Sequence, residues 1–116
     1  MLARLVPVAL LAALAAGCDS PLDGAGIDTD RLCALAGMAY EEQDFSDLLT
    51  DLERQTGANQ GDMSVAPDGV WIRMDGFFVM EEGYFVAKPG TEVSPDRADP
   101  YFTLLRGCLY RYTITG

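Results

Sequence analysis

The apolar residues that follow residue 28 recur with two different periods, the first of which is helical. Two sets fit it: Leu32, Leu35, Ala36 and Ala39, then Phe45, Leu48, Leu49 and Leu52. Positions i, i+3, i+4 and i+7 share one face of a helix, so residues 29–57 are predicted to form one bent helix or two short helices. Thr29 or Asp30 is expected to cap the first helix. Asp44 or Ser46 is expected to cap the second, and Gly57 to end it in the left-handed conformation.

The second period is that of β-strands. Residues 58–69 are rich in Gly, Asn, Asp and Pro and are predicted to form a loop, after which Val70 to Met74 alternates. Nine of the eleven aromatic residues fall between positions 71 and 112. Asp75-Gly76 and Glu82-Gly83 are predicted turns, with the apolar run 77–80 between them as a strand covered on both faces. A bulge at Gly76 within one longer strand is the alternative. Residues 88–100 are expected to form a surface loop.

Cys33 and Cys108 are expected to form a disulfide. They are an even pair once Cys18 is set apart in the N-terminal segment, and exported proteins oxidise such pairs. A bridge would close a loop of about 76 residues, which the loop-entropy relation values at roughly 4–5 kcal/mol. A buried thiol pair and two metal ligands are the alternatives, although structural zinc requires four ligands.

The final segment, residues 101–115, relates the sheet to the helices. Its second half alternates so that Cys108, Tyr110, Tyr112 and Ile114 share one face. Because Cys33 lies in the first helical segment, the face that carries Cys108 is expected to meet the helical layer. The predicted fold class is therefore α+β: one bent or two short N-terminal helices packed on a three- to four-stranded antiparallel sheet, pinned by a helix–sheet disulfide.

The N-terminal segment has the composition of an export signal. Arg4 supplies a positive charge, and residues 5–16 form an apolar run interrupted only by Pro7. This run is too short to span a bilayer and is typical of a secretory signal peptide. The segment Leu14-Ala15-Ala16-Gly17-Cys18 resembles the lipobox of bacterial lipoproteins. That resemblance implies cleavage after residue 17 and attachment of acyl chains, palmitate among them, to Cys18; an ordinary secreted protein is the alternative.

The lipobox resemblance sets the expected domain limits and location. Residues 1–17 would be the cleaved signal peptide, residues 18–28 a flexible acidic tether, and residues 29–116 a single small globular domain. In enterobacterial lipoproteins an Asp directly after the lipidated cysteine resembles a retention signal for the inner membrane, and Asp19 holds that position. The expected location is the periplasmic side of a bacterial membrane, with the inner membrane favoured and the outer membrane open.

Charge and composition exclude several function classes. The net charge is −10, and it becomes −11 when residues 1–17, whose only charged residue is Arg4, are removed. Nucleic acid is not expected as a partner because phosphates require clustered Lys and Arg. No histidine is present, and Asp23, Asp28 and Asp30 lack EF-hand spacing, so neither a metal nor a cofactor is expected. The acidic residues on the polar helix faces are expected to be solvated: Glu41, Asp47, Asp51 and Glu53.

Catalysis is not expected either. Ser46, Ser64 and Ser94 have no neighbouring base and no nucleophile-elbow context. Lys88 is the only lysine and precedes Pro-Gly, which suits a turn. The adjacent pairs Glu41-Glu42 and Glu81-Glu82 point their carboxylates apart on a helix or a strand.

Non-catalytic binding to another envelope protein is the predicted function, with the membrane reached through the lipid anchor. The candidate contact residues are aromatic, since they exceed what one sheet face can cover: Trp71, Phe78, Tyr84 and Tyr101. Core packing is the alternative role for each of them, and together they predict at least one exposed aromatic patch.

One resemblance and one alternative function bear on this prediction. The order of helices followed by strands is similar to that of the small outer-membrane lipoprotein subunit of the β-barrel assembly machinery, which implies an accessory role in the envelope. The acidic net charge supports an alternative, inhibition of a cationic periplasmic hydrolase such as lysozyme, with charge steering the encounter. Such a complex is expected to weaken steeply with added salt, unlike one held by aromatic burial.

Overall fold

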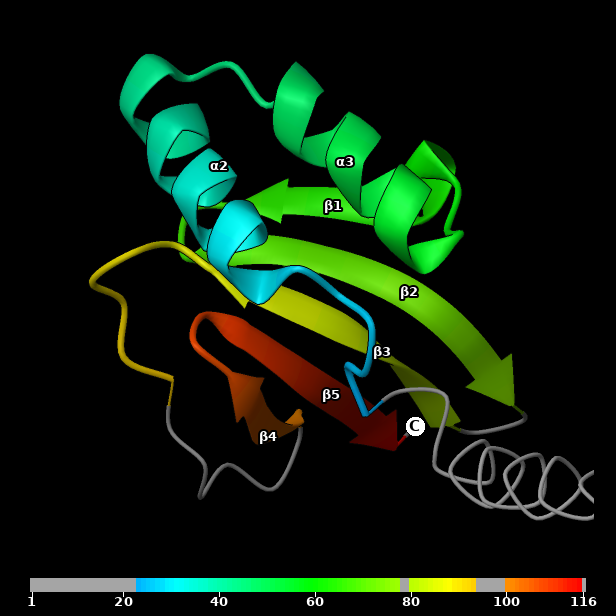
Figure 1. Cartoon of the computed structure of the whole chain (residues 1–116). Coiled ribbons are helices and arrows are strands. Elements are labelled where there is room, and N and C mark those ends of the chain that lie inside the picture. The colour runs from blue at the N-terminus through cyan, green and yellow to red at the C-terminus, as the bar shows by residue number, and fades with distance from the viewer. Residues whose placement is uncertain (1–22, 78–79, 94–99, 116) are drawn as a thin grey trace, which may run out of the picture.

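Two helices lie over one face of a five-stranded antiparallel sheet (Figure 1). The computed structural model describes residues 23–77, 80–93 and 100–115. The helices are α2 (Thr29–Glu42) and α3 (Ser46–Thr56), followed by a 3-10 turn, η2 (Gln60–Asp62). The strands are β1 (Met63–Ala66), β2 (Gly69–Phe77), β3 (Met80–Ala87), β4 (Tyr101–Arg106) and β5 (Leu109–Thr115). The predicted α+β class, with helices first, is confirmed.

The sheet order is β1-β2-β3-β5-β4, so β4 and β1 are the two edges. The chain leaves β3, crosses to the far edge to form β4, and then returns as β5 between them. The prediction of three to four strands was too low. β1 lies inside residues 58–69, which were predicted to be a loop, and residues 101–115 form a hairpin of two strands.

The helical segment forms two helices rather than one bent helix. Asp28, not Thr29 or Asp30, is the N-cap of α2, and its carboxylate accepts a hydrogen bond from the backbone N–H of Arg31 at 3.1 Å. Gln43 has a φ of 56° and ends α2 in the left-handed conformation. Phe45 is the N-cap of α3 and makes no side-chain cap hydrogen bond, so the prediction of Asp44 or Ser46 as the cap was wrong. Asp44 instead accepts the backbone N–H and the hydroxyl of Ser46, the first residue of α3.

Both predicted turns in the strand region were wrong. β2 continues through Asp75-Gly76, and β3 continues through Glu82-Gly83. The alternative of a bulge in one longer strand is correct in kind, but the register shifts between Arg73 and Asp75, so Met74 is the extra residue. A Cβ on Gly83 would overlap the carbonyl oxygen of Ile72. This glycine therefore allows β2 and β3 to approach closely at the bulge.

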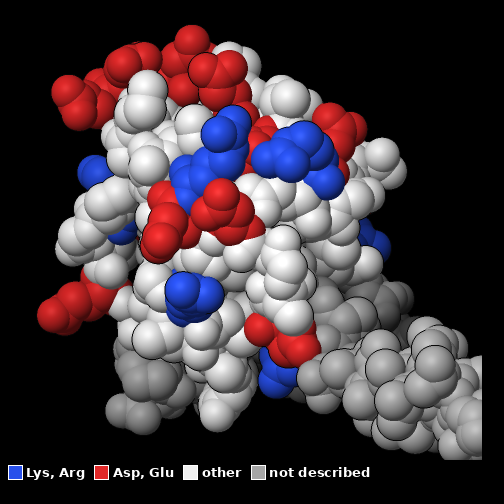
Figure 2. Space-filling model, viewed as in Figure 1, with Lys and Arg blue, Asp and Glu red and all other residues white. Residues whose placement is uncertain are grey.

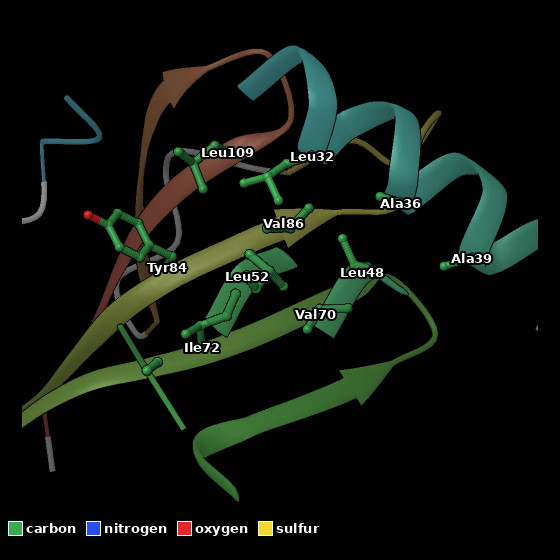
Figure 3. Close-up of a cluster of buried hydrophobic side chains, with 11 residues drawn as sticks. Leu32, Ala36, Ala39, Leu48, Leu52, Val70, Ile72, Tyr84, Val86 and Leu109 are labelled. Carbon is green, nitrogen blue, oxygen red and sulfur yellow. The ribbon is translucent and has the colours of Figure 1, made fainter. Parts of the chain in front are cut away.

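The main core lies between the helices and the sheet (Figure 3). Both helices contribute their apolar faces, as amphipathic helices that cover a sheet do. Gly57 ends α3 in the left-handed conformation, as predicted, with a φ of 80°. The buried residues that Figure 3 labels are Leu32, Ala36, Ala39, Leu48, Leu52, Val70, Ile72, Tyr84, Val86 and Leu109.

A second apolar cluster covers the opposite face of the sheet, here called the open face because neither α2 nor α3 lies over it (Figure 1). Its buried members are Phe85, Ala87, Phe102 and Tyr112, and Trp71, Val93, Tyr110 and Ile114 pack against them.

The predicted orientation of the last strand is contradicted by these two clusters. In β5, Tyr110, Tyr112 and Ile114 belong to the open face, whereas Leu109 belongs to the core under the helices. The apolar side of the strand that was expected to meet the helices therefore faces away from them.

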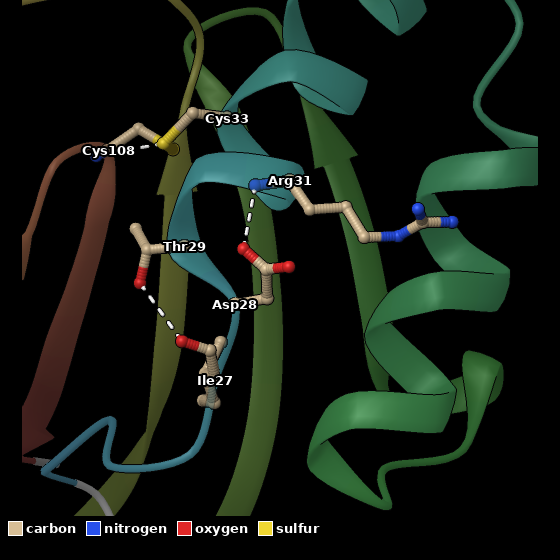
Figure 4. Close-up of a disulfide and its surroundings, with 6 residues drawn as sticks. All are labelled: Ile27, Asp28, Thr29, Arg31, Cys33 and Cys108. Atoms are coloured by element: carbon tan, nitrogen blue, oxygen red, sulfur yellow. Dashed lines mark hydrogen bonds between the residues drawn. A yellow bond between two sulfur atoms is a disulfide. The ribbon is translucent and has the colours of Figure 1, made fainter.

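The predicted disulfide between Cys33 and Cys108 is confirmed (Figure 4). It joins α2 to the turn between β4 and β5, across a sequence separation of 75 residues. Cys108 lies before the first residue of β5, so the alternation of that strand does not fix where its side chain points. This position explains why the disulfide did not predict which face of β5 meets the helices.

Candidate functional site

The four aromatic residues predicted as contact candidates have different environments. Tyr84 is only 3% exposed and belongs to the core under the helices, so its prediction as an exposed contact residue was wrong. Trp71 is half-buried on the open face, and Tyr101 is 52% exposed at the start of β4. Phe78 lies outside the described residues.

The aromatic side chains of the open face pack as one layer around Trp71. The centroid of its ring lies 4.7 Å from that of Phe85, 5.5 Å from that of Phe102 and 4.8 Å from that of Tyr112. Ring pairs at these separations stabilise one another beyond the area that they bury. Because three of these four rings are buried, most of the aromatic surface of this face forms a second core.

A polar contact is built into that layer. The hydroxyl of Tyr112 donates a hydrogen bond to Oε2 of Glu81 at 2.8 Å. Burial raises the pKa of Tyr112, and the hydrogen bond and charge of Glu81 raise it further, while the nearby Arg73 opposes them. The phenol therefore stays a neutral donor.

Two of the four large apolar side chains that are exposed among the described residues, Tyr101 and Leu104, lie on β4, which we call the β4 edge (residues 101–106). Leu104 is 58% exposed, and it pairs with Tyr110 on the open face. Within the described residues, no strand pairs with the outer side of β4, since the strand is last in the sheet order. The register shift between Leu104 and Arg106 bends this edge, a feature that limits edge-to-edge aggregation.

The sequence contained one signal for this surface that was not used. Tyr-Phe-Thr-Leu-Leu-Arg places Phe102 and Leu104 on the same side of a strand, and a strand that follows a long loop can be an edge. Leu104 was missed because only aromatic residues were considered as contacts.

Asp51 was predicted to be solvated, and the structure contradicts this. It is 4% exposed, and its carboxylate accepts hydrogen bonds from Arg31 at 3.0 Å, from Arg54 at 2.5 Å and from Gln55 at 2.7 Å. Burial raises the pKa of Asp51, but these hydrogen bonds outweigh burial and leave the pKa below its ordinary value. The cluster joins α3 to α2 and is explained by packing of the two helices.

A further polar contact joins α2 to β1. The hydroxyl of Tyr40 donates to the carbonyl oxygen of Ala66 at 2.5 Å, and the Nζ of Lys88 lies 5.7 Å from the centre of the Tyr40 ring. Burial, with the charge of Asp68, raises the pKa of Tyr40 to about 12. Tyr40 and Lys88 line a surface hollow of about 390 Å³ together with Phe45 and Val65.

Two of the three serines considered for catalysis lie in described parts of the chain, on different elements. Ser46 donates its hydroxyl to Asp44 at 2.7 Å at the exposed start of α3, Ser64 is exposed on β1, and Ser94 lies outside the described residues. Among the part of the chain that is described, no group of three or more Cys, Asp or Glu residues is placed to hold a metal ion.

The predicted membrane features fall mostly outside the described part of the chain. The signal peptide, the lipobox with Cys18, and Asp19 all precede residue 23. Of the predicted tether, residues 23–28 are described, and Ile27 packs against the main core. No helix within the described ranges is both long enough and apolar enough to cross a bilayer.

Comparisons with protein-family models, with curated proteins and with solved structures found no match for this chain. Its function is therefore inferred from its own surfaces.

Proposed function

We propose that this protein is a lipid-anchored lipoprotein of the bacterial envelope that binds another envelope protein without catalysing a reaction. The lipobox resemblance at Leu14 to Cys18 supports the anchor, and the disulfide supports an oxidising compartment. The contact surface is the open-face side of the β4 edge, where Leu104 lies, together with the adjoining rim of the open face.

The exposure of Leu104 carries the proposal. A leucine that is 58% exposed on an edge strand, beside the half-buried Tyr110, offers apolar area that a partner would cover. Complete burial of a fully exposed leucine side chain contributes about 1.5–3 kcal/mol to the free energy of association. No described strand pairs with the outer side of β4, so this side also offers backbone hydrogen bonds to an extended segment of a partner.

The experiment that tests this function is a pull-down of the tagged, lipidated protein from cross-linked native membranes. Leu104→Gln is expected to reduce recovery of one stoichiometric envelope protein by about tenfold or more, the factor that corresponds to about 1.4 kcal/mol. Met38→Gln is the matched control, since Met38 is 53% exposed on α2, away from the β4 edge. Equal losses with both variants, or no envelope partner at all, would refute the proposal.

Inhibition of a cationic hydrolase is the second candidate, and the charge distribution favours it. Figure 2 shows acidic side chains gathered over the connection between α2 and α3, where Glu41, Glu42, Asp44 and Asp47 are all exposed. A complex made through this acidic end would lose affinity steeply as salt is added, because exposed charges are screened. It would also be unaffected by Leu104→Gln, which separates the two candidates.

A further inference from the structure

The first described residues lie against the β4–β5 hairpin. A Cβ on Gly24 would be 3.4 Å from the side chain of Leu105 and 3.5 Å from that of Leu109. Asp23 and Gly24 line a hollow of about 270 Å³ together with Thr29 and Arg106. The chain therefore enters the domain beside this hairpin, on the side of the sheet that carries the helices.

The entry point limits how far the domain can stand from its anchor. Asp23 is five positions after Cys18, and a fully extended chain spans at most about 18 Å over five positions. If Cys18 carries acyl chains in the bilayer, as proposed above, the β4–β5 hairpin is held close to the headgroups.

Charge is distributed unequally between the two ends of α2. The hairpin, residues 101–115, contains Arg106 and Arg111 and no acidic residue, although the whole chain has a net charge of −10. Three acids adjoin the hairpin: Asp23 in the entering chain, Glu82, which lies opposite Thr113 on β3, and Glu81, which accepts the hydrogen bond from Tyr112 and lies opposite Ile114 of the open face.

The far end of α2 is strongly acidic. α2 begins beside the hairpin turn, where a Cβ on Gly107 would lie 3.3 Å from the side chain of Thr29. Its 14 residues extend roughly 21 Å to the acidic connection with α3. Tyr40, near that end, contacts β1 at the opposite edge of the sheet. The acidic end and the anchor end therefore lie over opposite edges.

We propose that the helix-facing side of the β4–β5 hairpin rests on anionic phospholipid headgroups, with the acidic end directed away from the bilayer. The contact residues are Tyr101, Arg106 and Arg111, which the strand register places on that side. Each arginine near an anionic surface contributes favourably to the free energy of membrane binding, and tyrosine is enriched at membrane interfaces. A weak contact between the hairpin and the headgroups is sufficient, because the tether holds the domain at a high local concentration beside the membrane.

This inference rests on the proposed lipid anchor, and the test separates the two. The lipidated protein is reconstituted into vesicles of phosphatidylethanolamine and phosphatidylglycerol whose acyl chains are brominated, and flotation is measured first. Tyr101→Trp and Met38→Trp are then compared, both in a Trp71→Phe background so that each protein has one tryptophan. Far-UV circular dichroism verifies that both variants fold.

Tryptophan at position 101 is expected to be quenched at least about twofold more than tryptophan at position 38, and the difference is expected to shrink in phosphatidylcholine vesicles or in high salt. Adding Arg106→Glu and Arg111→Glu to the Tyr101→Trp protein is expected to remove the excess quenching. Equal quenching of the two reporters in floating vesicles refutes the docking alone. Failure to float refutes the anchor, and the docking proposal falls with it.

Discussion

Removing the disulfide is expected to destabilise the domain severely. The bridge joins α2 to the β4–β5 turn across a sequence separation of 75 residues, and the loop-entropy relation gives about 4.5 kcal/mol for a closure of that length. A domain of this size has a total stability on the order of 5–10 kcal/mol. The bridge therefore supplies a large share of the free energy of unfolding.

The perturbation is the double variant Cys33→Ala with Cys108→Ala, which leaves no unpaired thiol. The melting temperature is expected to fall by roughly 20–35 °C, since each kcal/mol shifts it by about 4–8 °C in a domain of this size. Thermal and urea unfolding, followed by far-UV circular dichroism, measure the change. The wild-type protein with its disulfide chemically reduced is the control and is expected to match the variant.

The slope of the unfolding free energy against urea concentration shows whether the disulfide acts on the unfolded state or on the folded state. If the bridge acts by restricting the unfolded chain, its removal exposes more surface on unfolding and raises the slope. A large loss of stability with an unchanged slope would place the effect in the folded state instead. Identical melting temperatures for the oxidised protein and the double variant would refute the reasoning.

Three further predictions concern packing and ionisation. Gly83→Ala is expected to lower the free energy of unfolding by about 3 kcal/mol because a Cβ there would meet the backbone of β2. Gly61 has open space around it, so Gly61→Ala is expected to change this free energy by less than about 0.5 kcal/mol. Urea unfolding compares the two variants, and equal effects would contradict the crowding at Gly83. The depressed pKa of Asp51 stabilises the fold above about pH 4, and that contribution is lost as the pH falls further. Asp51→Asn should therefore weaken the fall in the free energy of unfolding below about pH 4. An unchanged fall would show that the Asp51 carboxylate does not stabilise the folded state. The raised pKa of Tyr40 stabilises the fold below about pH 10, and this contribution to stability is lost as the pH rises to about 12. Tyr40→Phe should therefore remove an ionisation near pH 12 from the ultraviolet titration.

The helical half of the fold could be predicted because its signals are local. Apolar spacing of i, i+3 and i+4 located both helices, and Gly57 marked the end of α3. The cap of α2 was misplaced by one or two residues, since Asp28, Thr29 and Asp30 all carry suitable side-chain oxygens. Only the backbone conformation at that point selects among them.

The strand half was harder because its signals depend on distant partners. Asp75-Gly76 and Glu82-Gly83 have the composition of tight turns, but they lie in β2 and β3, around the bulge at Met74. A glycine that admits a neighbouring backbone and a glycine that permits a turn look the same in sequence. β1 was missed because its four residues are flanked by loop-forming residues.

The candidate site could be predicted only in part for the same reason. Tyr101 is exposed as expected, but the exposure of Leu104 follows from β4 being an edge strand, and strand order is not encoded in local alternation. The buried state of Asp51 likewise depends on Arg31, which is 20 residues away.

The burial of β3 on both faces determines how the open face can function. Tyr84 and Val86 point into the main core while Phe85 and Ala87 point into the second, and all four are buried. A strand covered on both faces was predicted, but for residues 77–80 rather than for this stretch. Because the aromatic layer is itself a core, Phe85→Ala is expected to unfold the domain before it reveals anything about binding. The proposed contact with a partner is therefore best tested at the rim, where Leu104 can be changed without opening a cavity.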